Sequence, residues 1–414
     1  MTELRGRPQG RGSHDRGART LTPGTSHTLV DMLLDTDPVS HREFERQLLH
    51  DLVDTDARVR WRAAFDLACV GAPSGDAIAA LASAALHDTD ASVRTHAARA
   101  LVAGGSAAAA ALVTRLLDGA DHERSTELLA ALGAPAVDAL ATALEGDDPS
   151  VRWAAGGALE DIASGDAVQA LIGALTDDDD EVRHCAVTAL GHIGVPAVDA
   201  LLATLSDVSP VARSEAARAL GYQSDSRSFM PLIVALDDAD AEVRGSAAWA
   251  LGGLHDPRGL VPLLVALDDE DARVREGAAA GLGRSGDARA VRPLITAIDD
   301  EDDSVRCRTV TALGELGATR ALPFLIATLT CDASEDVRYA AADALGELGA
   351  AAVQPLLEAM DGEGEDARGW IALALESLGA PVIERSVAQH DCRLGPAHVR
   401  EALGWTDEGR AAAV

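Results

Sequence analysis

The sequence predicts an all-α fold, an α-solenoid in which helical hairpins stack into a right-handed superhelix. A Val-Arg dipeptide recurs usually 30 to 32 residues apart, a helix-capping side chain precedes it, and small or apolar residues follow it at helical spacing. Degenerate copies fill most gaps, with Ser125 and Ala212 in place of the arginine and Ala367 in place of the valine, so that about eleven units cover nearly the whole chain. The dipeptides are Val59-Arg60, Val93-Arg94, Val151-Arg152, Val182-Arg183, Val243-Arg244, Val274-Arg275, Val305-Arg306, Val337-Arg338 and Val399-Arg400.

The second helix of each unit begins at a capping side chain three residues before the valine. Asp and Ser side chains accept hydrogen bonds from the free backbone N–H groups of a helix start. Pro149 follows Asp148 at the first helical position, where its missing N–H costs nothing. The predicted caps are Asp56, Asp90, Asp148, Asp179, Asp240, Asp271, Asp302 and Ser334.

The body of the second helix follows from the spacing of its small and apolar residues. Ala278, Gly281 and Leu282 follow Val274 at offsets of four, seven and eight, on one face of a helix. A glycine comes after the final leucine of the pattern, where a left-handed residue ends many helices. We therefore expect each unit to be closed by Gly191, Gly252, Gly283, Gly314 or Gly346.

The first helix of each unit is represented by residues 260–267, with Pro262 near the start and Asp256-Pro257 as an upstream cap. No stretch shows the two-residue alternation of a strand. A hairpin of two such helices cannot bury its apolar face alone, so we expect it to stack on the next hairpin. The same proline placement recurs at Pro231, Pro293, Pro323 and Pro355.

The string from Asp256 to Gly283, Asp-Pro-Arg-Gly-Leu-Val-Pro-Leu-Leu-Val-Ala-Leu-Asp-Asp-Glu-Asp-Ala-Arg-Val-Arg-Glu-Gly-Ala-Ala-Ala-Gly-Leu-Gly, resembles the HEAT-like repeat named after phycobilisome lyases. The resemblance covers about residues 41–404. It implies the solenoid fold but no single function, because the repeat occurs in bilin lyases, in a di-iron hydroxylase and in many adaptors. It also suggests haloarchaeal HEAT-repeat proteins that act as taxis adaptors, linking receptor signalling and its response regulator to the rotary motor.

The composition is strongly acidic, with a formal net charge of −32 and no lysine among the 35 basic residues. This suggests an extreme halophile, since the Debye length falls to about 3 Å at 1 M salt; a GC-rich genome that replaces Lys by Arg is the alternative. Without basic stripes, nucleic acid is not expected as a partner. No apolar run approaches the ~20 residues of a membrane span and no hydrophobic signal region is present, so we expect a cytoplasmic protein without membrane insertion.

The chain divides into three predicted segments. Residues 1–28 read as a disordered basic arm suited to acidic surfaces, its own included, or as a terminus without a role. Residues 29–404 form the HEAT-like solenoid, with an N-terminal capping helix pair whose second helix starts at Asp37-Pro38, and residues 405–414 form a tail. The arginines of the arm are Arg5, Arg7, Arg11, Arg16 and Arg19.

The sequence contains no recognisable catalytic, metal or cofactor site. A di-iron site would need several His-Glu pairs, and only His122-Glu123 exists. Acidic turns such as 268–271 fail the calcium-loop pattern, because Arg273 stands where glycine is needed, so they are expected to be caps and solvated charge. The cysteines lack paired spacing and are expected to be small core residues in a reducing compartment: Cys69, Cys185, Cys307, Cys331 and Cys392.

The arginine of each Val-Arg dipeptide is the most regular charged residue of the chain. We expect it to bridge the acidic turn of its own unit and that of the next unit, as a structural ladder, in preference to binding an anion. Paired Arg–carboxylate hydrogen bonds suit this role better than a lysine ammonium would.

Aromatic residues make up only 3% of the chain, so their positions are informative. Trp61, Trp153 and Tyr339 directly follow Val-Arg, and Phe65 and Trp249 stand four residues further along the same helix face. These residues form the candidate partner-binding stripe on the concave side; filling gaps between Ala-rich helices is the alternative. We expect a non-enzymatic scaffold, most concretely a taxis adaptor between the chemotaxis response regulator and motor-associated adaptors. The alternative is a bilin lyase-like or other protein-modifying enzyme on the same repeats.

Removing salt should unfold the protein, because unscreened carboxylates repel one another. Thermal melts between low and molar KCl test this expectation. A melting temperature that is the same at both salt concentrations would rule out the halophile interpretation.

Overall fold

The computed structural model describes residues 38–70, 73–117, 122–360 and 364–379. These residues form 22 α-helices and five short 3-10 helices and contain no strand, so the prediction of an all-α solenoid is confirmed. The chain divides into two compact units, the first ending at Gly104 and the second beginning at Gly105. Predicted segments 1–28 and 405–414, residues 29–37 and the last dipeptide lie outside the described residues.

In the first unit, the residues that the structure describes form two helical hairpins. Its helices are α2 (Pro38–Asp51), α3 (Ala57–Val70), α4 (Gly75–His87) and α5 (Ala91–Val102). Helix α3 packs against both α2 and α5, and α4 packs against α5, so the two second helices, α3 and α5, lie side by side. Helix α2 begins at Pro38, as the Asp37-Pro38 pair predicts.

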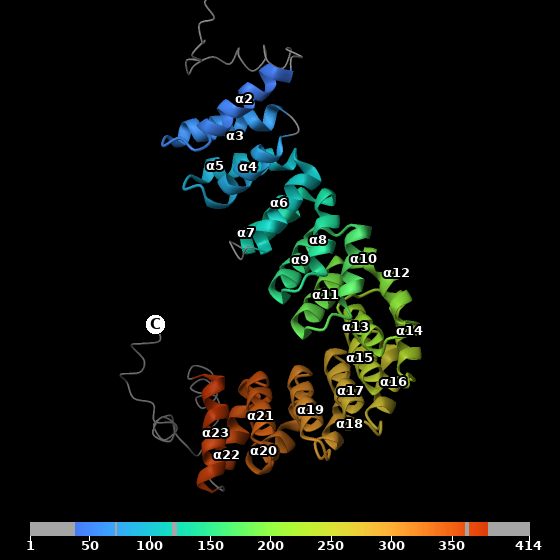
Figure 1. Cartoon of the computed structure of the whole chain (residues 1–414). Coiled ribbons are helices and arrows are strands. Elements are labelled where there is room, and N and C mark those ends of the chain that lie inside the picture. The colour runs from blue at the N-terminus through green and yellow to red at the C-terminus, as the bar shows by residue number, and fades with distance from the viewer. Residues whose placement is uncertain (1–37, 71–72, 118–121, 361–363, 380–414) are drawn as a thin grey trace, which may run out of the picture. The chain divides into compact units, whose positions relative to one another are not determined.

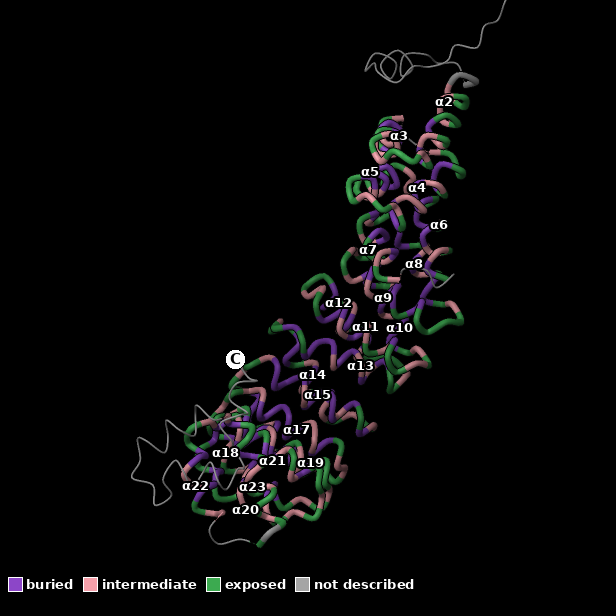
Figure 2. The backbone as a smooth tube through the Cα atoms, turned by 90° about the vertical axis from the view of Figure 1, so that its left-hand side faces the viewer, coloured by how far each residue is buried: buried purple, intermediate pink, exposed green. Residues whose placement is uncertain are grey.

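The described residues of the second unit form nine hairpins, each with a first and a second helix. Second helices contact one another in chain order from α7 to α23 (Figure 1), and buried stretches recur along the tube from helix to helix (Figure 2). Leucines at the 31-residue period, such as Leu251 and Leu282, are fully buried. The first helices are α6 (Gly105–Leu117), α8 (Val137–Leu144), α10 (Gly165–Ala174), α12 (Val195–Thr204), α14 (Phe229–Ala235), α16 (Leu260–Ala266), α18 (Val291–Ala297), α20 (Leu322–Cys331) and α22 (Ala350–Met360). The second helices are α7 (His122–Leu132), α9 (Pro149–Ile162), α11 (Asp180–Ile193), α13 (Pro210–Gly221), α15 (Ala241–Gly253), α17 (Ala272–Arg284), α19 (Asp303–Glu315), α21 (Glu335–Glu347) and α23 (Glu365–Leu378).

Short 3-10 turns precede several first helices. At η3 the Asp256 side chain accepts a hydrogen bond from the Arg258 N–H, as expected for an upstream cap, and Pro262 is the third residue of α16. Pro355 differs, because it lies inside α22. The 3-10 turns are η1 (Ala134–Ala136), η2 (Ser226–Ser228), η3 (Pro257–Gly259), η4 (Ala288–Ala290) and η5 (Thr319–Ala321).

The acidic turn between the two helices of a hairpin is organised by two side chains in an Asp-x-Asp pattern. The first aspartate, for example Asp269, accepts the N–H of the second, Asp271, at 2.9 Å. The second aspartate caps the following helix, as Asp271 does by accepting the Arg273 N–H. Of the predicted caps, Ser334 alone makes no such side-chain bond. The capping aspartates are Asp56, Asp90, Asp148, Asp179, Asp240, Asp271 and Asp302.

The predicted arginine ladder is present. Arg275 donates from Nε and Nη2 to the two carboxylate oxygens of Asp300, both at 2.8 Å, and from Nη1 to the carbonyl oxygen of Asp269 at 3.0 Å. One guanidinium therefore binds the turn of its own hairpin and the turn of the next. The same two-sided arrangement joins Arg60 with Asp88, Arg152 with Asp177, Arg213 with Asp238, Arg244 with Asp269 and Arg306 with Asp332.

The ladder has an interruption between α11 and α13. Arg183 binds the Asp177 carbonyl of its own turn, but its other nitrogens face Asp180 and, at 3.9 Å, Glu215. No aspartate of the following turn receives it in the way that Asp300 receives Arg275. The junction between these two hairpins therefore lacks the forked pair.

In two degenerate repeats, the predicted position of the Val-Arg pair is wrong by one residue. In α13 the ladder arginine is Arg213, and the buried Ala212 takes the place of the valine rather than of the arginine. Ser125 is likewise fully buried, like the valines of other repeats, so it too replaces the valine. In α13, Val211 comes directly before Ala212 and resembles the repeat valine in sequence, but it is 46% exposed.

The ladder aspartates are held in their charged form. Hydrogen bonding to Arg213 holds the pKa of Asp238 below its usual range, and Arg244 does the same for Asp269. At Asp300, burial opposes ionisation, but the hydrogen bonds from Arg275 and from the backbone leave the pKa lowered. Because these pKa values are lower in the folded chain, the stability they contribute is present above about pH 4 and is lost as the pH falls through the folded values.

The prediction that Gly252 and its equivalents end the second helices is wrong. All five glycines lie inside helices, where they allow neighbouring second helices to approach closely. A Cβ on Gly252 would lie 2.1 Å from the backbone oxygen of Gly281, and one on Gly283 would lie 2.9 Å from Cα of Ala312. The reason is steric: at this contact only a hydrogen atom fits.

The left-handed residue that ends the unit comes three positions later. Gly286 (φ 67°) and Gly317 (φ 61°) have this conformation, as do Gly194 and Gly349. In the repeat that contains Gly252 the corresponding residue is His255, with φ of 50°, although a side chain is unfavourable there. Four of these repeats thus use two glycines for two different physical reasons, one for close helix approach and one for a positive φ.

Replacing Arg275 by Ala should lower the free energy of unfolding by about 2–3 kcal/mol, because Asp300 would be left largely buried without its partner. Arg273→Ala is the matched control: the Arg273 side chain is 58% exposed, so its loss should cost less than about 1 kcal/mol. Urea unfolding gives the difference, and amide exchange should rise in α17 and α19. Equal stabilities of the two variants would contradict the ladder.

Gly252→Ala should destabilise the protein by about 1–3 kcal/mol, because the added methyl group forces α15 away from α17. Gly157→Ala provides the control, since a Cβ at this helical position meets nothing within 4 Å. That variant should be neutral or more stable by up to about 1 kcal/mol. Thermal melts measure the melting temperatures of the two variants. A higher melting temperature for Gly252→Ala than for Gly157→Ala would contradict the close approach of α15 and α17.

Candidate functional site on the second helices

The five residues of the predicted aromatic stripe all lie on second helices, but they belong to separate clusters. In the first unit, the rings of Trp61 and Phe65 on α3 are stacked with centroids 5.7 Å apart. The indole N–H of Trp61 donates to Nδ1 of His96 on α5 at 3.0 Å. This cluster joins two adjacent helices, and Phe65 remains 40% exposed.

In the second unit, Trp249 on α15 is half-buried. Its ring meets Tyr222 edge-on at 5.1 Å, and the guanidinium of Arg284 lies 3.8 Å above it. Arg284 also donates to the carbonyl oxygens of Gly221 and Trp249, so it binds the C-terminal ends of α13 and α15. Burial lowers the pKa of Arg284.

Two members of the stripe are well exposed. Tyr339 on α21 is 53% exposed and meets Trp370 of α23 edge-on at 4.8 Å. Trp153 on α9 is 56% exposed and lines a cavity of about 310 Å³ with His122 and Glu181. The structure therefore places packed rings at Trp61 and Trp249 and accessible ones at Trp153 and Tyr339.

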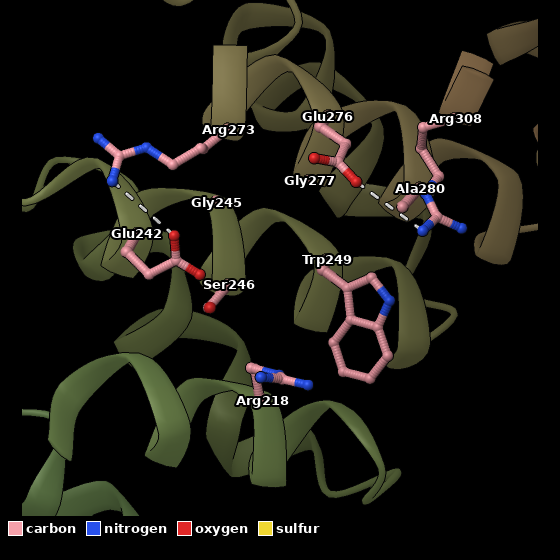
Figure 3. A pocket seen from close by; sticks show the side chains of 10 residues that line it. All are labelled: Arg218, Glu242, Gly245, Ser246, Trp249, Arg273, Glu276, Gly277, Ala280 and Arg308. Atoms are coloured by element: carbon pink, nitrogen blue, oxygen red, sulfur yellow. Dashed lines mark ion pairs between the residues drawn. The ribbon is translucent and has the colours of Figure 1, made fainter. Parts of the chain in front are cut away.

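A polar cavity of about 280 Å³ opens between α13, α15, α17 and α19, beside Trp249. Figure 3 shows two ion pairs at its wall, Arg273 with Glu242 at 4.0 Å and Arg308 with Glu276 at 3.8 Å. Each pair joins neighbouring second helices. The full lining is Arg218, Glu242, Gly245, Ser246, Trp249, Arg273, Glu276, Gly277, Ala280 and Arg308.

Two further cavities share residues with this one. The cavity around His184 also contains Arg218, Glu242 and Arg273, and the cavity around Cys307 also contains Glu276 and Arg308. We call the three together the charged groove; it crosses the second helices from α11 to α21. Its walls combine arginine guanidinium groups, carboxylates and one indole.

Some carboxylates of the charged groove are partly removed from water. Burial raises the pKa of Glu215 in spite of the nearby guanidinium groups of Arg218 and Arg183. Burial likewise raises the pKa of Glu276. The arginines of the groove lie farther from their carboxylate partners than the ladder arginines do. The N–O distance is 3.3 Å for Arg218 with Glu215 and 3.8 Å for Arg308 with Glu276, against 2.8 Å for Arg275 with Asp300.

Sequence reasoning missed the charged members of this site. Arg218, Arg273 and Arg308 occupy different positions within their repeats, so no period marks them. Tyr222 and Arg284 were missed because each lies at the end of its helix, beyond the Val-Arg pattern.

In the part of the chain that the structure describes, no group of three His, Cys, Asp or Glu residues could hold a metal ion, and no helix is long and apolar enough to cross a membrane. Cys185 is a partly buried thiol whose pKa burial and the charge of Glu160 raise to about 11. Cys69 and Cys331 are exposed, so the expectation that all cysteines are core residues is wrong for these two. Cys392 lies outside the described residues.

Stacked hairpins, caps and the shared face of second helices define a helical repeat protein. The chain belongs to the HEAT repeat family, whose model matches residues 45–133, 137–221, 229–306 and 291–376. Residues 212–238 also match the PBS lyase HEAT-like repeat, which confirms the resemblance stated from the sequence. No curated protein matches the sequence.

Several solved structures are similar to this chain at low identity. The karyopherin Kap121p bound to the extreme C-terminus of the protein phosphatase Cdc14p has a TM-score of 0.50 and 15% identity, over 84% of this chain and 45% of that one. Kap121p bound to Nup53p has a TM-score of 0.50 and 13% identity, over 88% and 49%. The CpcE–CpcF complex of phycocyanin lyase from Nostoc sp. PCC7120 has a TM-score of 0.36 and 22% identity, over 57% and 93%. This chain spans less than half the length of the two karyopherin chains.

Proposed function

We propose that this protein is a non-enzymatic scaffold that binds partner proteins on its second helices. The charged groove carries the proposal: it extends over several hairpins and offers arginines, carboxylates and Trp249 side by side. Protein interfaces are enriched in aromatic and arginine side chains, and a long open groove suits a polypeptide better than a small substrate. Trp153 and Tyr339 extend the accessible aromatic surface on the same set of helices.

In its most concrete form, the proposal is a haloarchaeal taxis adaptor. Its partners would be the chemotaxis response regulator and motor-associated adaptors, and its compartment the cytoplasm. The resemblance to haloarchaeal HEAT-repeat adaptors and the acid-rich, lysine-free composition support this form. The four described cysteines are free thiols, in keeping with a reducing compartment.

A bilin lyase-like or other protein-modifying enzyme is the second candidate, because residues 212–238 match the PBS lyase HEAT-like repeat. A bilin absorbs visible light, so the absorbance spectrum of the purified protein separates the two functions. Pigment bound to the protein would favour the enzyme.

Partner binding should depend on the charged groove. With the tagged full chain in molar KCl, Arg308→Glu should lose partners that the wild type retains, since it reverses the charge of a groove arginine that is 43% exposed. Arg289→Glu is the matched control, because Arg289 is 65% exposed and lies on η4, away from the groove. Trp153→Ala tests the aromatic surface without disturbing the packed Trp249.

Identical partners for the wild type and Arg308→Glu, with helix content unchanged, would exclude the groove as the binding site. Recovery of a response regulator among the partners that Arg308→Glu loses would support the taxis form. If those partners included no chemotaxis or motor protein, the result would support a scaffold and would contradict the proposal of a taxis adaptor.

A further inference from the structure

Large apolar side chains are exposed on first helices of the second unit. In α14, Met230 and Val234 are 59% and 69% exposed. Arg227 stands three residues before Met230 and Asp237 stands three residues after Val234, and both are exposed. Residues three or four positions apart lie on one face of a helix. One exposed stripe therefore runs along α14 and its two ends, in the order arginine, two apolar residues, aspartate.

The next first helix repeats this stripe. Arg258, Val261, Val265 and Asp268 have the same order and spacing along η3 and α16, and all four are exposed. The guanidinium of Arg258 lies 4.2 Å from the centre of the Phe229 ring of α14, so the two stripes are adjacent. Figure 1 shows α14 and α16 in succession on the same side of α15 and α17. We call their exposed apolar residues the first-helix patch: Met230, Val234, Val261 and Val265.

Polar residues limit the first-helix patch to these two helices. In the preceding repeat, α12 has Asp199 and Ala203 at the two apolar positions of the stripe. In the following repeat, α18 has Arg292 and Thr296 there. Single apolar residues scattered over a surface are ordinary, whereas a group of them rimmed by polar residues marks an interaction site.

The two ends of the first-helix patch carry opposite charge. At one end, the Arg258 side chain is mostly exposed, whereas the carboxylate of Asp256 that it binds is mostly covered. The group that a partner meets at this end is therefore a guanidinium, and Arg227 of the neighbouring stripe is exposed in the same way. At the other end, the partner meets the exposed carboxylates of Asp237 and Asp268.

A surface with this order of charges is complementary to itself. A two-fold dimer brings the same patch of both copies face to face. When the first helices of the two copies run antiparallel, the arginine end of each stripe meets the aspartate end of the other, and the apolar residues meet in the middle. When they run parallel, arginines face arginines and carboxylates face carboxylates, which is unfavourable.

We propose that two copies of this chain form a two-fold dimer through the first-helix patch, with their first helices antiparallel. Arg258 of each copy then meets Asp268 of the other, and the valines of α16 pack together between these pairs. Each chain carries a net charge of −32, so the dimer needs enough salt to screen the repulsion between copies. The second helices stay uncovered, so the dimer joins two charged grooves in one assembly.

The dimer requires no other protein, so its test is independent of partner binding in the charged groove. Sedimentation equilibrium of the full chain in molar KCl measures the dissociation constant of the dimer. The double variant Val234→Glu, Val265→Glu should raise this constant at least about tenfold, because it buries carboxylates in the centre of the patch. Val211→Glu is the matched control and should leave the constant unchanged, since Val211 is an exposed valine of the second helix α13. Circular dichroism confirms that the variants are folded.

A second pair of variants tests the antiparallel arrangement. Asp268→Arg should raise the dissociation constant severalfold, because it places an arginine opposite Arg258 of the other copy. Glu270→Arg makes the same charge change at an exposed residue outside the stripe and should leave the constant near that of the wild type. In a parallel dimer the sign would be reversed, since Asp268→Arg would then face carboxylates and tighten the dimer.

A chain that stays monomeric at every protein concentration would overturn the proposal. A dimer that Val211→Glu weakens and the double valine variant does not would also overturn it, and would assign self-association to the second helices. Tighter association of Asp268→Arg than of Glu270→Arg would overturn the antiparallel arrangement. A dimer that is lost in the double valine variant, weakened by Asp268→Arg and unaffected by both controls supports the proposal.

Discussion

At six junctions between described hairpins, one arginine fixes a hairpin to the next, because its guanidinium faces two turns at once. Arg275 binds the carbonyl oxygen of its own turn with one nitrogen and the carboxylate of Asp300 with the other two. The same aspartate accepts the N–H of Asp302, which caps the helix that follows. The ion pair, the turn and the helix start are therefore one connected network, and the relative position of adjacent second helices depends on it.

Such a chain derives its stability from contacts between neighbours. Where the ladder and the glycine contacts coincide, as between α15 and α17, adjacent helices touch backbone to backbone. Where Arg183 finds no aspartate in the next turn, the forked pair is replaced by a longer contact with Glu215, at 3.9 Å, and by a hydrogen bond from the Gln223 amide to the Leu190 carbonyl oxygen. We therefore expect stability to differ along the second unit, with local opening easier at the α11 to α13 junction.

The repeat period, the caps and the ladder could be predicted because each depends on residues close in sequence. The role of Gly252 could not, since a glycine after a leucine looks the same whether it ends a helix or receives the backbone of another helix. The position of Ala212 in its repeat was predicted wrongly because Val211, the residue before it, has the same side chain as the repeat valine. The five aromatic residues do lie on second helices, as the sequence pattern predicts. The clusters in which their rings pack could not be predicted, because they involve Arg284, Tyr222 and Trp370, which follow no period.

The charged groove and the Trp153 cavity differ in the side chains that they expose. In the groove, Arg273 and Arg308 are already paired with carboxylates of neighbouring helices. If partners bind there as proposed, a partner exchanges ion pairs in order to bind, which favours specificity over strength. The Trp153 cavity combines a ring that is 56% exposed with the carboxylate of Glu181.

The ladder aspartates lose their charge in acid, and the ladder arginines have a different consequence at alkaline pH. A guanidinium does not lose its proton in water at any pH that proteins tolerate, and this sequence contains no lysine ammonium that would. Strong alkali therefore leaves every rung charged, so the hairpins should separate in acid long before any titration in base can loosen them. Because this sequence contains no lysine, it also offers no lysine side chain as an acceptor for acetyl or ubiquitin transfer.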